Sequence, residues 1–223
     1  METEKQITLP AKLLQRIVFD CMLIGLYLSF VIFTAIDFSK VGWAPHNEHQ
    51  QEIFRSLSGI GWRVGALGRL AFYTFFTIGF FIYQMRLFTK LSVRKHLVIN
   101  WVMIIGSVFL LAGSSLPVSG QSELLVDILH GIFCQVGTVM MVTAVGLMVI
   151  AYCRETKTSK NAKARVYVPY IVMVLIGALG LVTTGSDGVL VSAMFSLMAT
   201  FMAMIYLNYL TVCFELAPKL LKA

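Results

Sequence analysis

Six long apolar runs constrain the fold of this chain more than any other feature of the sequence. They cover approximately Leu13–Ile36, Val64–Met85, Leu97–Ser115, Leu124–Tyr152, Val166–Thr184 and Val189–Phe214. A helix of roughly 17–25 apolar residues crosses the hydrocarbon core of a bilayer, and each run is near or above that length. The runs therefore predict an all-α, polytopic integral membrane helix bundle with six transmembrane helices.

Composition supports a membrane class and argues against soluble ones. Hydrophobic residues make up 58% of the 223 residues and charged residues 13%, whereas soluble domains have about 45–50% and about 25%. Membrane strands would alternate apolar and polar residues, and these runs do not. The formal net charge is +7, but the cations lie between apolar runs, so we expect no nucleic-acid partner. The connections are short, which predicts a single membrane domain over residues 1–223.

The positions of the cations predict the orientation of the spans. Lys and Arg accumulate on the cytoplasmic side of membrane proteins. Fourteen of the eighteen cations lie in the N-terminal segment, the second and fourth connections and the C-terminal segment. The other four are Lys40, Arg55, Arg63 and Arg69. Both termini are therefore expected in the cytoplasm, with the first run kept as a span rather than removed as a signal peptide.

The longest connection, from Asp37 to about Arg63, is expected on the outer surface. Within it, the apolar residues of Ile53–Ile60 share one helical face and stand next to Trp62. Tryptophan favours the membrane interface. This pattern predicts a short interfacial helix in the connection.

The fourth run carries an unusual polar face near its outer end. Glu123, Asp127, His130 and Cys134 are spaced i, i+4, i+7 and i+11, which places them on one side of a helix. Ionisable groups are costly inside membranes and usually face a bundle interior or an aqueous cavity. A cation site, a proton relay or a general acid and base would each use such groups. We predict that His130 marks any functional site and faces the interior.

A structural interpretation of the same residues stays open. Glu123 suits the first turn of a helix at the interface, because the helix dipole favours an anion there. Asp127 suits an ion pair with Arg69 or Arg63, which would fasten the second span to the fourth. Alternatively, the two arginines extend to the lipid headgroups.

Histidines in the first outer connection raise the question of a metal. His46 and His49 flank Glu48, and together with His130 they would offer ligands that zinc accepts. Two histidines in a polar connection are more often solvated. The chain has no CxxC or HExxH motif, and its four cysteines predict neither a metal site nor a disulfide framework. No cofactor is expected.

Two stretches resemble a known membrane family. Residues Ser56–Phe88, SLSGIGWRVGALGRLAFYTFFTIGFFIYQMRLF, and Leu111–Phe133, LAGSSLPVSGQSELLVDILHGIF, are similar to segments of the six-span family catalogued as domain of unknown function 998. That bacterial and archaeal family is a distant relative of the Frag/DRAM/Sfk membrane proteins. Pro117 and His130 are the matching positions. The resemblance implies six spans, a bacterial or archaeal cytoplasmic membrane, and a link to lipids.

Three classes of function remain open at this stage. The first is a non-enzymatic subunit that binds membrane lipids or the spans of other integral membrane proteins through small-residue and Met-rich faces. The second is a small transporter or proton-coupled channel. The third is a lipid-modifying enzyme that uses His130 with Asp127.

Overall fold

The computed structural model describes residues 11–41, 67–92, 96–116, 124–156, 160–183 and 189–220. Within these ranges the chain forms six α-helices and no strand, which confirms the all-α prediction for the described residues. The helices are α1 (Ala11–Val41), α4 (Leu67–Leu91), α5 (Leu97–Ser115), α6 (Leu124–Glu155), α7 (Lys160–Thr183) and α8 (Val189–Leu220).

Five of the six helices differ in their bounds from the apolar runs that predict them, and most extend further. The bounds of α5 agree with the run, whereas α6 continues through Arg154 to Glu155 and α8 continues past Glu215. Hydropathy falls where charged side chains begin, but Arg and Glu are good helix formers and the backbone hydrogen bonds continue. An apolar run therefore marks the part of a helix suited to lipid, and not its full length.

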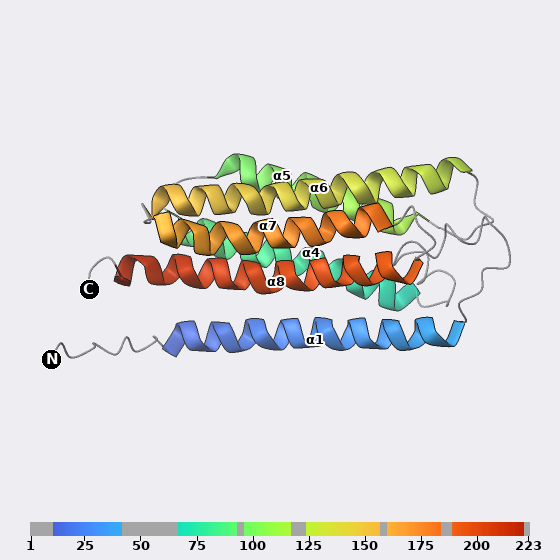
Figure 1. Ribbon diagram of the computed structural model, residues 1–223, viewed down its shortest axis with the longest axis horizontal. Helices are drawn as coiled ribbons and strands as arrows, with labels where there is room; N and C mark the ends of the chain where they lie inside the picture. Colours follow the sequence, from blue (N-terminus) through green and yellow to red (C-terminus); the bar gives the residue numbers. More distant parts are fainter. Residues whose placement is uncertain are drawn as a thin grey trace.

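The helices lie side by side along the long axis of the molecule (Figure 1). The chain runs up and down, so that α1 begins and α8 ends at the same end of the bundle. The closest partners are α5 with α6 and α7 with α8, while α4 packs against α8 and α5. Helix α1 lies at the edge, where it packs mainly on α8 and less on α4.

The centre of the bundle is filled by large apolar side chains. Phe88, Met103, Met148, Met204 and Leu207 have no exposed surface. Methionine has an unbranched, flexible side chain that fills irregular gaps between helices. The core thus holds α4, α5, α6 and α8 together by close packing.

The outer faces of the helices are apolar as well. Large exposed apolar side chains run along three helices: Leu14, Val18, Phe19, Met22, Leu26, Leu28, Ile32, Phe33 and Ile36 of α1; Leu97, Val98, Trp101, Ile104, Ile105 and Val108 of α5; and Val168, Ile171, Val172, Leu175 and Leu179 of α7. In the described part of the chain, three segments are long and apolar enough to cross a membrane: Leu97–Ser115, Ile128–Glu155 and Met198–Leu216. An apolar surface around an apolar core is typical of a membrane protein.

Glycines allow α5 and α6 to approach closely. A Cβ atom on Gly137 would lie 2.8 Å from the backbone nitrogen of Leu110 and 2.9 Å from the carbonyl oxygen of Gly106. A Cβ atom on Gly113 would lie 2.9 Å from the backbone nitrogen of Cys134. Backbone atoms cannot rotate away as a side chain can. Close contact through small residues is a common way for membrane helices to pack.

We predict that Gly137→Ala destabilises the bundle, because the added methyl group would force α5 and α6 apart. The matched control is Gly131→Ala on the same helix, where a Cβ atom would meet nothing within 4 Å. The control should be neutral or stabilising by up to about 1 kcal/mol, because alanine favours a helix. Gly137→Ala should cost about 1–3 kcal/mol. Unfolding of both purified variants in detergent checks this, and equal stability would contradict the close-contact account.

Candidate functional site

Helix α1 turns polar side chains toward the bundle and apolar ones away from it. Arg16, Asp20 and Tyr27 are spaced i, i+4 and i+11, so they share one face with the buried Leu13 and Ile24. Asp20 is completely buried. In a soluble protein, a helix face with charged side chains would point to the water outside the bundle. The opposite face of α1 carries apolar side chains, and Arg16, Asp20 and Tyr27 find partners on α4 and α8.

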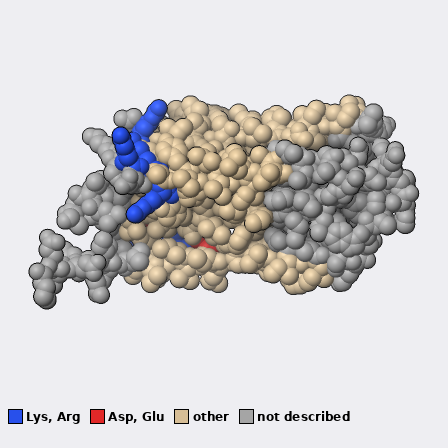
Figure 2. All heavy atoms as spheres, in the orientation of Figure 1, with Lys and Arg blue, Asp and Glu red and all other residues tan. Residues whose placement is uncertain are grey.

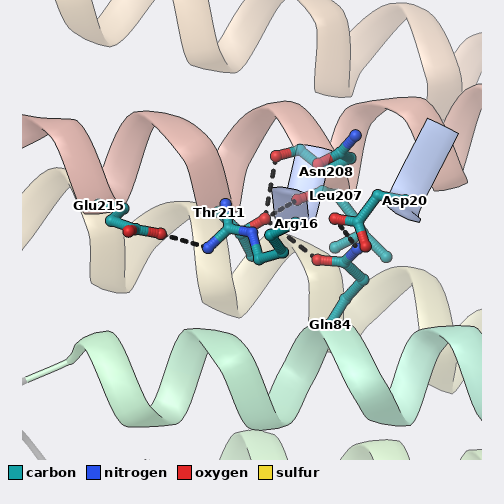
Figure 3. Close-up of polar contacts among 7 residues, drawn as sticks. All are labelled: Arg16, Asp20, Gln84, Leu207, Asn208, Thr211 and Glu215. Carbon is teal, nitrogen blue, oxygen red and sulfur yellow. Dashed lines mark hydrogen bonds and ion pairs between the residues drawn. The ribbon is translucent and has the colours of Figure 1, made fainter. Parts of the chain in front are cut away.

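Asp20 belongs to a chain of hydrogen bonds that joins three helices (Figure 3). The side-chain amide Nε2 of Gln84 on α4 donates to Oδ2 of Asp20 over 3.1 Å. The hydroxyl of Thr211 on α8 lies 3.1 Å from Oε1 of Gln84, which accepts. The same hydroxyl also lies 3.0 Å from the carbonyl oxygen of Leu207 and 2.9 Å from that of Asn208. Gln84 and Thr211, like Asp20, have no exposed surface.

An ion pair lies beside this chain. Arg16 on α1 contacts Glu215 on α8, and both side chains are largely buried. Arg16 also acts electrostatically on Asp20, and the Tyr83 hydroxyl lies near the same carboxyl group. One guanidinium therefore serves two carboxyl groups. Charges in a low-dielectric interior interact strongly, but they are also costly to bury.

A pair of tyrosines joins α1 to α4 further along α1, about two turns after Asp20. The hydroxyl of Tyr27 donates to the hydroxyl of Tyr73 over 3.0 Å, and the ring centroids are 5.5 Å apart. Tyr27 also stacks against Phe201 of α8. Arg16, Asp20 and Tyr27 thus each attach the edge helix to its neighbours.

A second polar cluster lies where α4 ends, α5 begins and α6 ends. His96 Nε2 is 2.8 Å from Oε1 of Glu155 and 2.7 Å from the hydroxyl of Ser92. The Ser92 hydroxyl also donates to Oε1 of Glu155 over 2.6 Å. In a catalytic triad the imidazole contacts the nucleophile with one nitrogen and the acid with the other. Here the same nitrogen, Nε2 of His96, contacts both Ser92 and Glu155, and Ser92 donates directly to Glu155. This geometry differs from that of a triad, and the cluster connects the ends of three helices.

The structure places His130 in α6 with 5% of its surface exposed. Its Nε2 lies 3.8 Å from Sγ of Cys134, one turn further along the helix. Nearby, Phe133 of α6 meets Phe109 of α5 edge to face. His130 thus lies in the half of α6 that begins at Leu124, away from the network around Asp20.

The remaining residues of the predicted site lie wholly or partly outside the described part of the chain. His46, His49 and Glu123 fall there, as do the Ile53–Ile60 segment, Arg63 and Pro117. Asp127 lies in α6 and Arg69 in α4, but their side chains are not described. The ion pair between the second and fourth spans therefore stays a prediction. Among the described residues, no three His, Cys, Asp or Glu side chains are grouped closely enough to hold a metal.

Sequence reasoning missed the network around Asp20. His130 was singled out because Glu123, Asp127, His130 and Cys134 lie at i, i+4, i+7 and i+11 in an apolar run. Arg16, Asp20 and Tyr27 repeat three of these positions, i, i+4 and i+11. That signal could have been read in the first run. Nothing in the sequence could have paired Asp20 with Gln84 and Thr211, which are 64 and 191 residues further along the chain.

Comparison with known proteins adds no relative: no family model matches the chain, and neither a curated protein nor a solved structure does. The resemblance to the six-span family rests on the two quoted stretches alone. The candidate site is therefore described from its own geometry.

We predict that the links of the network are coupled energetically. Gln84→Met keeps the length of the side chain but leaves a buried carboxyl group without its donor, which costs about 1–3 kcal/mol of unfolding free energy. Thr211→Val should cost about 1 kcal/mol by itself and less in the Gln84→Met background, because its partner is already gone. Unfolding of the two single variants and the double variant in mixed micelles measures this coupling.

The matched control is Thr143→Val. Thr143 is exposed on α6 and its hydroxyl bonds only to the carbonyl of Val139 in its own helix. Its effect should stay within about 0.5 kcal/mol. Strict additivity of Gln84→Met and Thr211→Val would mean that the two side chains act independently.

Proposed function

We propose that the chain is a six-span integral membrane protein with both termini in the cytoplasm, and that it acts without catalysis as a lipid-binding or accessory subunit. The observation that carries the proposal is that large apolar side chains lie on the outside of the bundle and polar side chains are paired inside it. Outward faces of α1, α5 and α7 carry large apolar side chains, and the buried polar side chains Asp20, Gln84 and Thr211 bond to one another. Such a surface meets lipid tails and the spans of other membrane proteins.

The placement of the cations supports the orientation. Lys90 is in the last turn of α4, Arg154 is in the last turn of α6, and Lys160 begins α7. Figure 2 shows the described cations gathered at one end of the molecule, the end at which α1 begins. Because Lys and Arg are retained in the cytoplasm during insertion, that end is the cytoplasmic one.

Helix α1 is the best candidate for a partner face. It lies at the edge of the bundle, and its outward side chains include Met22, which is 69% exposed, and Phe33, which is 58% exposed. At the edge of the bundle, contact between α1 and lipid can be replaced by contact with the span of a partner protein. This costs little energy, because lipid tails and membrane spans are both apolar. The methionine adds a surface that adapts to different neighbours.

Cysteine labelling tests the orientation. In a variant whose four native cysteines are serine, a single cysteine replaces Lys160 or Ser119. An impermeant maleimide added to intact cells should label position 119 and leave position 160 unlabelled until the membrane is opened. Labelling of position 160 in intact cells would contradict the proposed topology.

Photo-crosslinking tests the accessory role. A photoreactive amino acid at Met22 of α1 should form one discrete protein adduct in cells, and at Leu175 of α7 it should crosslink mainly to lipid. The control position is Met148, which is fully buried and should crosslink only within the chain. Lipid adducts alone at Met22 would argue against a partner at α1.

A further inference from the structure

We propose that Asp20 is a proton-binding site, and that the Gln84 amide and the Thr211 hydroxyl keep Oδ2 of its carboxyl group hydrogen-bonded in both protonation states. The inference goes beyond the proposed function, which requires no proton. It rests on the charge balance of the network, on a buried oxygen without a partner, and on the hydrogen-bonding capacity of the three side chains.

The charge balance leaves one negative charge in excess. Arg16 contacts Glu215, and in the described part of the chain it is also the one cation that acts on Asp20. The groups that face Asp20 from α4 are the uncharged Gln84 and Tyr83. Across the network, α8 contributes Thr211, Asn208 and the acid Glu215. One bound proton would make the group neutral, with Arg16 and Glu215 as a balanced ion pair.

A buried oxygen of Asp20 lacks a donor. Oδ2 accepts from Gln84, whereas Oδ1 has no hydrogen-bond partner and the residue has no exposed surface. An unsatisfied oxygen is more costly on an ionised carboxylate than on a neutral carboxylic acid. The amide oxygen of Asn208, a residue with 9% exposure, is also without a donor. Nε and one terminal nitrogen of Arg16 are also buried without a partner, but their positive charge is already counted above. The bare oxygen of Asp20 therefore favours the neutral form of its carboxyl group.

The hydrogen bonds at Oδ2 of Asp20 can be kept with the proton absent or present. When Asp20 is ionised, Gln84 Nε2 donates to Oδ2 and Thr211 donates to Gln84 Oε1, as in Figure 3. When a hydronium ion gives up a proton that forms an O–H bond at Oδ2 and becomes water, the amide turns over so that Oε1 accepts a hydrogen bond from this O–H and Nε2 donates to the Thr211 oxygen. The hydroxyl hydrogen of Thr211 then bonds to the carbonyl of Leu207 or Asn208, both already within reach. The step transfers one proton and no electrons.

A proton fits this site better than a metal cation does. A cation needs several oxygens directed at one point, whereas Gln84 presents a donor to the carboxylate. Its own oxygen is already occupied by Thr211. The described residues also contain no group of three metal-binding side chains.

Infrared spectroscopy of the purified full-length chain in lipid bilayers tests the proposal. A protonated carboxylic acid has a carbonyl-stretching band that a carboxylate lacks. At neutral pH the protein should show this band, and it should shift in D2O. Asp20→Asn should remove it, and Asp20→Glu should move it. The matched control Glu155→Gln removes an acid of the other cluster and should leave the band intact.

Two further measurements separate a proton switch from an isolated protonated acid. Thr211→Val should shift the Asp20 band, because the amide loses the partner that lets it turn over, and Thr211→Ser should restore its position. Replacing choline chloride with sodium chloride at constant pH should change nothing. Absence of the band in the wild-type protein, its survival in Asp20→Asn, insensitivity to Thr211→Val, or its loss on adding sodium would each overturn the proposal.

Discussion

The constraint on which this structure depends is that a polar group surrounded by apolar matter must find its partner inside the protein. In α1 this constraint sets the orientation of the helix. Arg16, Asp20 and Tyr27 bond to groups on α4 and α8, and the apolar side chains on the other face suit lipid. Rotating α1 about its axis would leave a carboxyl group and a guanidinium in hydrocarbon. The polar bonds therefore specify the position of a helix that has little other packing.

The bundle joins its helices in two physically different ways. Between α5 and α6, Gly106, Gly113 and Gly137 remove side chains so that the backbones approach, and the attraction is van der Waals contact. Between α1 and its neighbours, longer side chains bridge the gap with directional bonds. Close packing is rigid, whereas a hydrogen-bonded chain such as Asp20–Gln84–Thr211 can rearrange its protons without moving the helices.

The candidate site was harder to predict than the fold. His130 was singled out from its spacing with Asp127 and Cys134, and the structure describes it as a buried residue beside Cys134. Asp20 was overlooked although its spacing from Arg16 and Tyr27 repeats part of that pattern. The sequence did not predict that Gly113 and Gly137 allow α5 and α6 to come close, because spacing within one helix does not say which neighbour it meets. The spacing of residues along one apolar run shows which side chains share a face of the helix. Which groups these side chains contact depends on the neighbouring helix.

The sequence by itself determined that the chain is helical and approximately where each helix lies, because the length of an apolar run and the absence of alternation depend on local residues alone. It also determined that cations gather in alternate connections. The tertiary structure decided that Asp20 meets Gln84, that Arg16 pairs with Glu215, and that His96 and Ser92 share Glu155. These partners are 59 to 199 residues apart along the chain. Such pairs depend on the order and rotation of whole helices, which are set by the sum of many contacts between helices.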